Sequence, residues 1–360
     1  MRVLHVINSL APGGAERLLA DLLPGLSARG VEVSLFVLDA RGDAFSAQLS
    51  AAGVPVSFAR PAGASPYSPI RALDVAHAVR ETRPDIVHAH LAPSLHWCAA
   101  AAKGTVLIST EHASANRRMR APLFRNLERT VYRHCERTIC VSADTAAALV
   151  TWLGLPLEHF PVIANGVPLE RFSGGVVPAA DVAAWKHGRR AIAMTARLVP
   201  EKGHAVALEA LEKLPANHCL VFAGDGAERG RLEAFARELG LGDRCLFLGS
   251  RSDVPSVLAA CDMYLQSSLV EGFGIAALEA MASGLPVVAS EAPGLGDLVR
   301  GAGLLFASGN AAACAAAILR TSEEAERLAA AGKRRAAEYS IERCVERYFE
   351  LYAQCFPARQ

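Results

Sequence analysis

The sequence predicts an α/β protein built from two doubly wound domains, and three observations support this prediction. The chain has 360 residues, which exceeds the size of a typical single hydrophobic core. Its composition, 52% hydrophobic and 20% charged residues, is typical of a folded globular protein. Strand-like and helix-like segments alternate along the whole chain, and this alternation favours parallel sheets with crossover helices.

The first half of the chain contains one series of alternating segments. Ser142 has the character of an N-cap for the helix that follows it. We expect strands at 3–10, 31–38, 86–89, 106–110 and 138–141, a short one at 162–163, and helices near 15–29, 122–134 and 144–153. This series ends at Asn165-Gly166.

A second series follows a loosely patterned stretch that extends to Arg190. We expect strands at 191–195, 219–223, 245–248, 263–266, 286–289 and 304–306, and helices near 203–214, 228–239, 253–260 and 275–283, with Ala-rich helices over 311–338. The domain boundary is therefore expected near 168–188, which gives domains of residues 1–170 and 180–340. The segment 341–355 has the apolar spacing of one further helix.

Composition also restricts the classes of partner. Lys plus Arg number 37 and Asp plus Glu number 36, so the charge balance gives no reason to expect a nucleic acid. The nine cysteines are scattered without a Cys-x-x-Cys pair, which indicates reduced thiols in a cytoplasmic protein, not a disulfide framework or a zinc site. No apolar run approaches the roughly 18–20 residues of a membrane-spanning helix.

Two glutamates with one turn and part of a helix between them carry the most chemical information. Glu271 falls on a turn after an apolar strand, Gly272, Phe273 and Gly274 complete that turn, and Glu279 lies inside the following helix. The glycines allow backbone N–H groups at the helix start to approach an anion. Nearby carboxylates would accept hydrogen bonds from neutral hydroxyls, so the pattern suits a phosphate-linked sugar. A glutamate pair alone would more often belong to a solvated helix face.

Two cations follow the first strand of the second series. Arg197 and Lys202 lie within a few residues of its carboxyl end, where they can converge on a diphosphate and neutralise a leaving group. Gly13-Gly14 follows the first strand of the chain and opens a helix, which permits a close backbone approach to phosphate. Each feature alone also fits an ordinary exposed loop or turn. Gly13-Gly14 does not have the Gly-x-Gly-x-x-Gly spacing of a dinucleotide site, and Gly224-Asp225-Gly226 later in the chain has its third glycine, Gly230, one residue too late for it.

Histidines follow two neighbouring strands of the first domain. His112 comes directly after strand 106–110 and is expected at the ligand-binding edge of the sheet. His88 and His90 are two positions apart and share one face of their strand. Metal binding through this pair would need further ligands, and the sequence shows none nearby.

One short region is strongly basic. Between positions 117 and 137 there are seven arginines and two glutamates, a net charge of +5, interleaved with apolar residues. Its first members are Arg117, Arg118, Arg120 and Arg125. This pattern suggests a surface for an anionic lipid or for a pyrophosphate-linked acceptor. A solvated helix face that packs on its own core explains the pattern equally well.

Taken together, these motifs and their order resemble the retaining, nucleotide-sugar-dependent glycosyltransferases of family 4, which have the GT-B fold. The resemblance spans nearly the whole chain. It rests on Glu271-Gly-Phe-Gly with Glu279, on Arg197 with Lys202-Gly203, and on supporting motifs. These are Gly13-Gly14-Ala15-Glu16, Asp85-Ile86-Val87-His88-Ala89-His90, Asn165-Gly166-Val167, Gly224-Asp225-Gly226 and Phe247-Leu248-Gly249.

The resemblance implies two Rossmann-like domains that face each other across a cleft. The N-terminal domain would bind the acceptor, the C-terminal domain the nucleotide sugar, and the final helix, 341–360, would pack back on the N-terminal domain. Arg197 and Lys202 would hold the diphosphate, Glu279 the ribose hydroxyls, and Glu271 the donor sugar. Gly13-Gly14 would close over the distal phosphate, and His112 would contact the sugar near the transferred carbon.

By the same resemblance, transfer would occur on the front face of the sugar with retention of configuration. Because no Asp-x-Asp lies near the proposed site, we expect no metal ion and no other cofactor. The donor would be a UDP-linked hexose or N-acetylhexosamine, with GDP-mannose as the second choice. The acceptor would be a glycan or a polyprenyl-pyrophosphate-linked saccharide of a bacterial surface polysaccharide, such as lipopolysaccharide or exopolysaccharide. The enzyme would then act peripherally at the inner face of the cytoplasmic membrane.

The sequence departs from the family pattern at three places. Ala196 stands where a glycine commonly precedes the arginine, Asp297 replaces a more usual glutamate, and Ala276-Ala277 are smaller than the apolar residues often found there. These departures affect the expected donor more than the reaction class. Three alternatives remain: a nicotinamide-dependent oxidoreductase, which lacks its glycine fingerprint here, a sugar-nucleotide epimerase on the same architecture, and a non-catalytic partner subunit.

Overall fold

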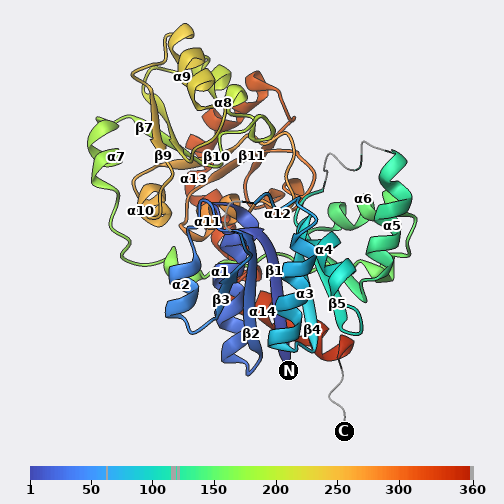
Figure 1. Cartoon of the computed structure of the whole chain (residues 1–360). Coiled ribbons are helices and arrows are strands. Elements are labelled where there is room, and N and C mark those ends of the chain that lie inside the picture. Colours follow the sequence, from blue (N-terminus) through green and yellow to red (C-terminus); the bar gives the residue numbers. More distant parts are fainter. Residues whose placement is uncertain (62–63, 115–118, 120–121, 357–360) are drawn as a thin grey trace. The chain divides into compact units, whose positions relative to one another are not determined.

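The computed structural model describes residues 1–61, 64–114, 119 and 122–356, and the chain forms two compact units. Unit 1 consists of Met1–Gly166 together with Ile341–Gln360, and unit 2 consists of Val167–Ser340. Each unit contains one six-stranded parallel sheet flanked by helices (Figure 1). The predicted fold class, α/β with two doubly wound sheets, is confirmed.

In unit 1 the strand order is β3-β2-β1-β4-β5-β6. The strands are β1 (Arg2–Ser9), β2 (Glu32–Asp39), β3 (Val56–Phe58), β4 (Ile86–His90), β5 (Val106–Glu111) and β6 (Arg137–Cys140). The helices are α1 (Gly14–Ala28), α2 (Ser46–Ala51), α3 (Arg71–Thr82), α4 (Ser94–Ala101), α5 (Arg125–Arg133), α6 (Ala143–Leu153) and α14 (Ile341–Cys355), with 3-10 turns at Pro122–Phe124 and Leu157–His159. The order reverses beside β1, which creates the switch point where α/β sheets bind ligands.

Local signals explain several of these boundaries. The Ser142 hydroxyl accepts a hydrogen bond from the Thr145 amide at 3.2 Å, which confirms the predicted N-cap of α6. The helix predicted near 122–134 is a 3-10 turn followed by α5. The predicted strand at 162–163 is wrong, because Val162 makes only an isolated bridge to Cys140. Two apolar residues are too few to form a ladder of their own.

Helix α14 packs within unit 1 although it is the last helix in the sequence (Figure 1). Its Tyr348 and Tyr352 are fully buried. At Gly25 of α1, a Cβ atom would lie 2.5 Å from a methyl group of Val345, so a side chain there would disturb the contact between the two helices. The apolar face of α14 is therefore covered by α1 and the sheet.

In unit 2 the strand order is β12-β11-β10-β7-β8-β9. The strands are β7 (Arg190–Thr195), β8 (His218–Ala223), β9 (Cys245–Gly249), β10 (Met263–Gln266), β11 (Val287–Ser290) and β12 (Leu304–Phe306). The helices are α7 (Ala180–Trp185), α8 (His204–Glu212), α9 (Arg229–Glu238), α10 (Val254–Ala259), α11 (Ile275–Ala282), α12 (Gly296–Val299) and α13 (Ala311–Glu338), with 3-10 turns at Leu169–Arg171 and Pro200–Lys202. The Ala-rich segment expected as several helices is the single helix α13.

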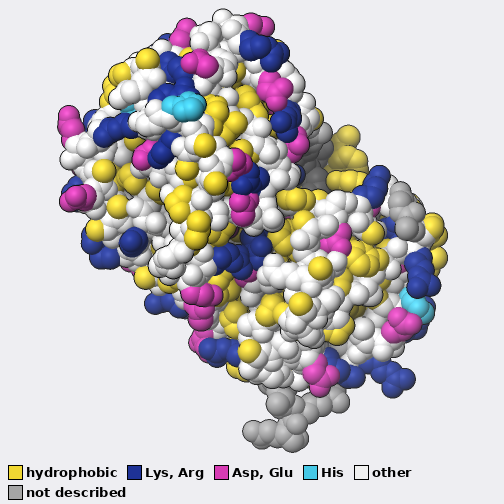
Figure 2. All heavy atoms as spheres, turned by 90° about the vertical axis from the view of Figure 1, so that its left-hand side faces the viewer, with side chains coloured by type: hydrophobic (Ala, Val, Ile, Leu, Met, Phe, Trp, Pro, Cys, Tyr) yellow, Lys and Arg dark blue, Asp and Glu magenta, His cyan; other side chains and the backbone are white. Residues whose placement is uncertain are grey.

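The distribution of surface charge and the state of the cysteines agree with the composition of the chain. On the face drawn in Figure 2, basic and acidic side chains are interspersed, in keeping with 37 Lys plus Arg against 36 Asp plus Glu. All nine cysteines are free thiols, and only Cys355 is not buried. Among the described residues, no helix has both the length and the apolar character needed to cross a bilayer.

Candidate functional site

The polar residues of unit 2 gather where β7 and β10 end. These two strands are parallel neighbours, with Ala193 of β7 opposite Tyr264 of β10. Their carboxyl ends therefore lie at the same edge of the sheet, where α/β proteins bind ligands. Arg197 and Lys202 follow β7, and Glu271 follows β10.

Lys202 and Glu271 form an ion pair at this edge. The Lys202 Nζ atom lies 2.7 Å from Glu271 Oε2, and the two side chains are 20% and 13% exposed. The same carboxylate oxygen accepts hydrogen bonds from Ser268 Oγ at 3.0 Å and from Gln266 Nε2 at 3.3 Å. The carboxylate is thus fixed in place by three donors, while both charged groups retain some access to solvent.

The backbone holds the two loops of this ion pair together. The Glu201 carbonyl accepts hydrogen bonds from the amides of Leu269 at 2.8 Å and Val270 at 3.3 Å. Gly203 has φ of +66°, and a Cβ atom there would lie 2.1 Å from the Ser267 carbonyl oxygen. Only glycine allows this approach, so the glycine after Lys202 sets the position of the lysine relative to Glu271.

A buried network of polar side chains on β7 and β10 supports Glu271. The Tyr264 hydroxyl donates to Gln266 Oε1 at 2.6 Å and lies 3.2 Å from Thr195 Oγ1. Burial, the largest cause, raises the pKa of Tyr264, and the nearby charges of Glu279 and Glu271 add to this effect. The phenol therefore remains a neutral hydrogen-bond donor, which fixes the orientation of the Gln266 amide that contacts Glu271.

Arg197 presents a cation at the same strand end. Its side chain is exposed, and it has no hydrogen-bond or ion-pair partner among the described residues. The loop that carries it packs against the Gly224-Asp225-Gly226 turn, where a Cβ atom at Gly224 would lie 2.0 Å from the Ala196 carbonyl oxygen. Asp225 Oδ1 accepts a hydrogen bond from the Gly226 amide at 2.7 Å. This glycine motif therefore supports the arginine loop.

The turn before α11 is closely packed. Gly274 is the N-cap of α11 with φ of +99°. A Cβ atom at Gly294 would lie 2.2 Å from the Gly272 carbonyl oxygen. Phe273 is 6% exposed and packs edge-on against Tyr339, with 5.4 Å between the ring centroids. Phe273 therefore anchors the turn through packing, while Glu279 is buried inside α11 at 9% exposure.

In unit 1, the residues predicted from the sequence lie at the ends of β1 and β5. Gly13 is the N-cap of α1 and Gly14 is its first residue. His112 follows β5, and its Nε2 atom lies 3.3 Å from Nδ1 of His90. The Nδ1 atom of His112 is buried and has no partner among the described residues. Burial lowers the pKa of His112 to about 4, so the ring is neutral at pH 7.

His5 joins His88 and His90, although it was not among the residues predicted from the sequence. Parallel pairing of β1 with β4 places His5 opposite His88, so three histidines lie on one face of the sheet. Nitrogen atoms of the three rings lie within 4.8 Å of one another. However, the rings of His88 and His90 are stacked at 4.3 Å with 15° between their planes. Nitrogen lone pairs lie in the ring plane, so stacked rings do not aim them at one metal ion.

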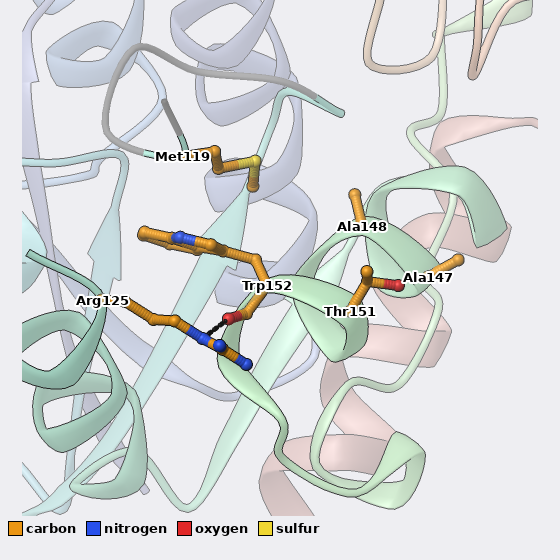
Figure 3. A pocket seen from close by; sticks show the side chains of 6 residues that line it. All are labelled: Met119, Arg125, Ala147, Ala148, Thr151 and Trp152. Carbon is orange, nitrogen blue, oxygen red and sulfur yellow. Dashed lines mark hydrogen bonds between the residues drawn. The ribbon is translucent and has the colours of Figure 1, made fainter. Parts of the chain in front are cut away.

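The basic segment is only partly described. Arg117, Arg118 and Arg120 lie outside the described residues. Arg125 begins α5, and its Nε atom donates a hydrogen bond to the Trp152 carbonyl. Together with Met119, these residues line a cavity of about 610 Å³ (Figure 3), whose other wall is Ala147, Ala148 and Thr151 of α6. In the view of Figure 3, the Trp152 ring lies between Met119 and Arg125.

Large apolar side chains are exposed beside this cavity. Leu123 is 95% exposed, Phe124 57% and Leu127 56%. They lie within the 3-10 turn and the first turns of α5, next to Arg125. These three side chains thus point to solvent beside arginines, whereas Val131 and Tyr132 of the same helix pack on the core of unit 1.

Family models match most of the chain. The family model "Glycosyltransferase Family 4" matches residues 12–171, and the model "Glycosyl transferases group 1" matches residues 180–337. D-inositol 3-phosphate glycosyltransferase of Mycobacterium sp. (strain JLS) is 33% identical over 234 residues, which cover 60% of this chain and 53% of that protein. The chain thus matches about half the length of this relative. The putative glycosyltransferase EpsF of Bacillus subtilis (strain 168) is 27% identical over 309 residues, covering 81% of this chain and 79% of EpsF.

Solved structures share the fold over nearly the whole chain. Anabaena Alr3699/HepE in complex with UDP-glucose has a TM-score of 0.86 and 24% identity, covering 98% of this chain and all of that one. WaaG, a glycosyltransferase involved in lipopolysaccharide biosynthesis, has a TM-score of 0.76 and 19% identity, covering 99% of this chain. The two sheets and their flanking helices thus define a transferase of the GT-B fold. The chain belongs to glycosyltransferase family 4.

Proposed function

We propose that this glycosyltransferase moves a hexose or N-acetylhexosamine from a nucleoside diphosphate sugar to a lipid-linked or other surface glycan. A UDP-sugar is the favoured donor and GDP-mannose the second choice. The observation that carries this proposal is the Lys202–Glu271 ion pair at 2.7 Å, beside Arg197, which follows the same strand as Lys202 and whose side chain has no partner in the described part of the chain. Two cations and a fixed carboxylate at one sheet edge match a diphosphate joined to a sugar.

Each group has a role in this reaction. Arg197 and Lys202 neutralise the charge that develops on the leaving diphosphate, and the N-terminal amides of α11 add to this effect. Glu271 orients the donor sugar and stabilises positive charge near the reacting carbon. Glu279 accepts hydrogen bonds from the ribose hydroxyls. In unit 1, Gly13 and Gly14 contact the distal phosphate, and His112 contacts the sugar.

Transfer proceeds with retention on the front face of the sugar. The bond from the anomeric carbon to the phosphate oxygen breaks while the acceptor oxygen bonds to that carbon on the same face. The departing phosphate oxygen takes the acceptor proton, so no covalent sugar–enzyme bond forms. Glu271 is therefore an electrostatic and positioning group, unlike the paired carboxylates of glycosidases. Arg197 and Lys202 take the part that a metal ion plays in other transferases, so activity does not require one.

The acceptor proposal rests on the surface of α5. Exposed Leu123, Phe124 and Leu127 beside Arg125 combine apolar insertion with attraction to anionic headgroups. This combination supports peripheral binding at the inner face of the cytoplasmic membrane, where a polyprenyl-linked glycan is available as acceptor.

Labelled nucleotide sugars, incubated with and without a lipid-linked acceptor, test the transfer reaction. We expect label to move only when the acceptor is present, and the Lys202→Ala variant to lose transfer. Lys186→Ala is the matched control, because it breaks a similarly exposed ion pair, 3.2 Å from Asp262, at the opposite end of β10. Conversion of the free donor without acceptor would instead indicate an epimerase. Normal transfer by the Lys202→Ala variant would remove Lys202 from the site.

Thermal shifts with UDP and GDP identify the base of the donor. Under the favoured proposal, UDP raises the melting temperature more than GDP does, and a larger shift with GDP would favour GDP-mannose. The shift should disappear in the Lys202→Ala variant and remain in Lys186→Ala.

Vesicle binding tests the membrane proposal separately. Serine replacements of Leu123, Phe124 and Leu127 should weaken binding to vesicles that contain anionic lipid, without slowing transfer to a soluble acceptor analogue. Leu73→Ser is the control, because Leu73 is 70% exposed on α3 of the same unit. Equal binding by the triple variant and the control would contradict the proposal.

A further inference from the structure

Three imidazole rings of unit 1 form a continuous hydrogen-bonded chain. His5 Nδ1 lies 3.0 Å from His90 Nε2, and His90 Nδ1 lies 3.3 Å from His112 Nε2. The rings of His5 and His90 are wholly buried. The outer nitrogen at each end, His5 Nε2 and His112 Nδ1, is buried and has no partner among the described residues. The chain of rings thus begins inside the sheet and ends at a polar atom that has no hydrogen bond within the described part of the protein.

The number of protons limits this chain to two arrangements. Burial lowers the pKa of His5 to about 3, of His112 to about 4, and of His90 well below its ordinary value, so each ring is neutral and carries one proton. A neutral ring donates from one nitrogen and accepts at the other. Both ring-to-ring hydrogen bonds must therefore point in the same direction. Either all three rings carry the proton on Nδ1, or all three carry it on Nε2.

The two arrangements differ in the cost at the inner end. With the protons on Nε2, the buried His5 Nε2–H would be a donor without an acceptor. With the protons on Nδ1, His5 Nε2 is a bare acceptor, and the unpaired donor is His112 Nδ1–H. Buried unpaired donors are rarer in proteins than buried unpaired acceptors, and His5 is wholly buried, whereas His112 is only partly buried and follows β5 at the edge where α/β sheets bind ligands. The Nδ1 arrangement is therefore favoured, because it places the unpaired N–H group on His112, the end of the chain where a ligand can supply the acceptor.

We infer that His5 and His90 position His112 so that its Nδ1 presents a neutral N–H donor to an oxygen atom of the substrate. The substrate group is a sugar hydroxyl or a phosphate oxygen, bound by a hydrogen bond and not by an imidazolium charge. That His112 contacts the substrate rests on the proposed function. The proton arrangement of the chain rests on the geometry of unit 1 alone.

His88 is not part of the hydrogen-bonded row of histidines, but it holds the ring of His90 in its orientation. Its Nδ1 lies 2.5 Å from the Tyr352 hydroxyl and its Nε2 lies 2.7 Å from Thr110 Oγ1, so both of its nitrogens are occupied. Its ring stacks on His90 at 4.3 Å. Rotation of His90 out of the chain would break this stack, so the packing of α14 on the sheet preserves the orientation of His90.

Nitrogen-15 NMR of histidine-labelled protein without substrate measures the proton positions directly. We expect His5, His90 and His112 all to carry the proton on Nδ1, whereas free histidine prefers Nε2–H. A proton on Nε2 of His112 would overturn the inference. Addition of Zn²⁺ should leave the three signals unchanged, and stoichiometric shifts of His5, His88 and His90 would assign these rings to a metal site instead.

Two variants separate positioning from simple stability. His90→Phe keeps an aromatic ring but removes both nitrogens of the central link, so His112 should revert to Nε2–H. If the transfer reaction is confirmed, kcat/KM should fall about tenfold, the value of one hydrogen bond. His88→Phe is the matched control: it disturbs the same buried cluster but should leave His112 protonated on Nδ1. Reversion of His112 in the control as well would contradict the chain.

The two proposals can fail independently. If the wild-type protein transfers no sugar but His5, His90 and His112 carry the proton on Nδ1, the proposed function is wrong and the inference about the histidines still holds. If transfer occurs but His112 carries the proton on Nε2, the proposed function still holds and the inference about the histidines is wrong.

Discussion

The two sheets of this protein carry polar clusters of opposite character. In unit 2, the cluster at the ends of β7 and β10 is charged and partly exposed, with side-chain exposures of 20% for Lys202 and 13% for Glu271. In unit 1, the cluster on β1 and β4 consists of wholly buried histidines and tyrosine hydroxyls. Both are built on parallel sheets with the same number of strands.

The difference shows how burial selects the chemistry of a polar cluster. Water can still reach Lys202 and Glu271, so opposite charges survive there at a moderate desolvation cost. Around His5 and His90 water is excluded, and the imidazoles remain neutral and satisfy one another through hydrogen bonds. Only the cluster in unit 2 is therefore equipped to neutralise a charged leaving group, whereas the cluster in unit 1 is suited to orienting a neutral donor.

Mild acid should separate the two clusters most strongly. The histidines of unit 1 have lowered pKa values when folded, about 3 for His5 and about 4 for His112, but titrate near 6.5 when unfolded. The unfolded chain therefore takes up protons first as pH falls. Each such histidine reduces the free energy of unfolding by up to ~1.4 kcal/mol per pH unit below about pH 6.5. Stability is thus fully present above pH 7 and is lost toward pH 4.

Hydrogen exchange by mass spectrometry, corrected for the intrinsic effect of pH, measures this loss in each unit. Peptides from β1 and β4 should lose protection between pH 7 and pH 5 before peptides from β7 and β10. The His90→Phe variant should show a shallower dependence on pH, because one titrating group is gone. Equal protection of both sheets at pH 5 would show that the histidines do not control acid stability.

Removal of the charge of Glu271 should have the next largest effect. Glu271→Gln keeps the size of the side chain but leaves Lys202 without a counter-charge and the sugar without a carboxylate. We expect kcat to fall about 100- to 1000-fold, as for other fixed electrostatic groups, with little change in melting temperature. Asp262→Asn, which breaks the ion pair with Lys186, should change kcat by less than about threefold. Similar losses in both variants would indicate a structural role for the two pairs.

The position of Lys202 can be tested through the glycine beside it. Gly203→Ala should destabilise the protein by about 2–3 kcal/mol, because the alanine would adopt a left-handed conformation and also meet the Ser267 carbonyl. Gly240→Ala separates the two causes, because Gly240 has φ of +69° and a Cβ atom there would meet no atom within 4 Å. The Gly240→Ala substitution should lower the free energy of unfolding by only about 1 kcal/mol. Urea unfolding measures both, and equal costs would mean that the contact with Ser267 relaxes freely.

The smallest effects should come from removing one hydroxyl from each network. Tyr352→Phe leaves His88 Nδ1 without its partner, and Tyr264→Phe removes the donor to Gln266. Each should destabilise the protein by roughly 1–2 kcal/mol. Only Tyr264→Phe should also lower kcat, because Gln266 contacts Glu271. Steady-state kinetics and thermal unfolding of both variants make this comparison, and a lower kcat in Tyr352→Phe alone would reverse it.

Much of the architecture could be predicted because fully buried parallel strands are continuous apolar runs. Some short elements were not identified from sequence, among them β3 with three residues and α7 with six. The strand β12 also has three residues but was predicted, because Leu304-Leu305-Phe306 is a continuous apolar run, whereas β3 is interrupted by Ser57. Helix α3 was also missed. It begins with Arg71, which is fully buried and donates hydrogen bonds to the carbonyls of Pro61 and Ala64. A buried arginine satisfied by backbone oxygens breaks the apolar spacing that indicates a helix.

The candidate site was predictable as a set of strand ends but not as a set of contacts. The rule that ligands bind at carboxyl ends of parallel strands points to Lys202 and Glu271 separately. Their 2.7 Å contact depends on the approach of Gly203 to Ser267, which joins segments far apart in the sequence. His5 was missed because its partner strand is not next in sequence. The signal that could have identified it is that His5 is a lone polar residue inside the apolar run of β1.

The position of α14 in the sequence determines when unit 1 can be completed during synthesis. Unit 2 is one uninterrupted stretch, Val167–Ser340, whereas unit 1 needs residues from both sides of it. During translation, the ribosome therefore releases every strand of unit 2 before it releases Tyr348 and Tyr352. Until then His88 lacks the phenol that caps its Nδ1. The nascent N-terminal sheet must therefore wait, with the face beneath α14 uncovered, until Ile341–Cys355 has been synthesised.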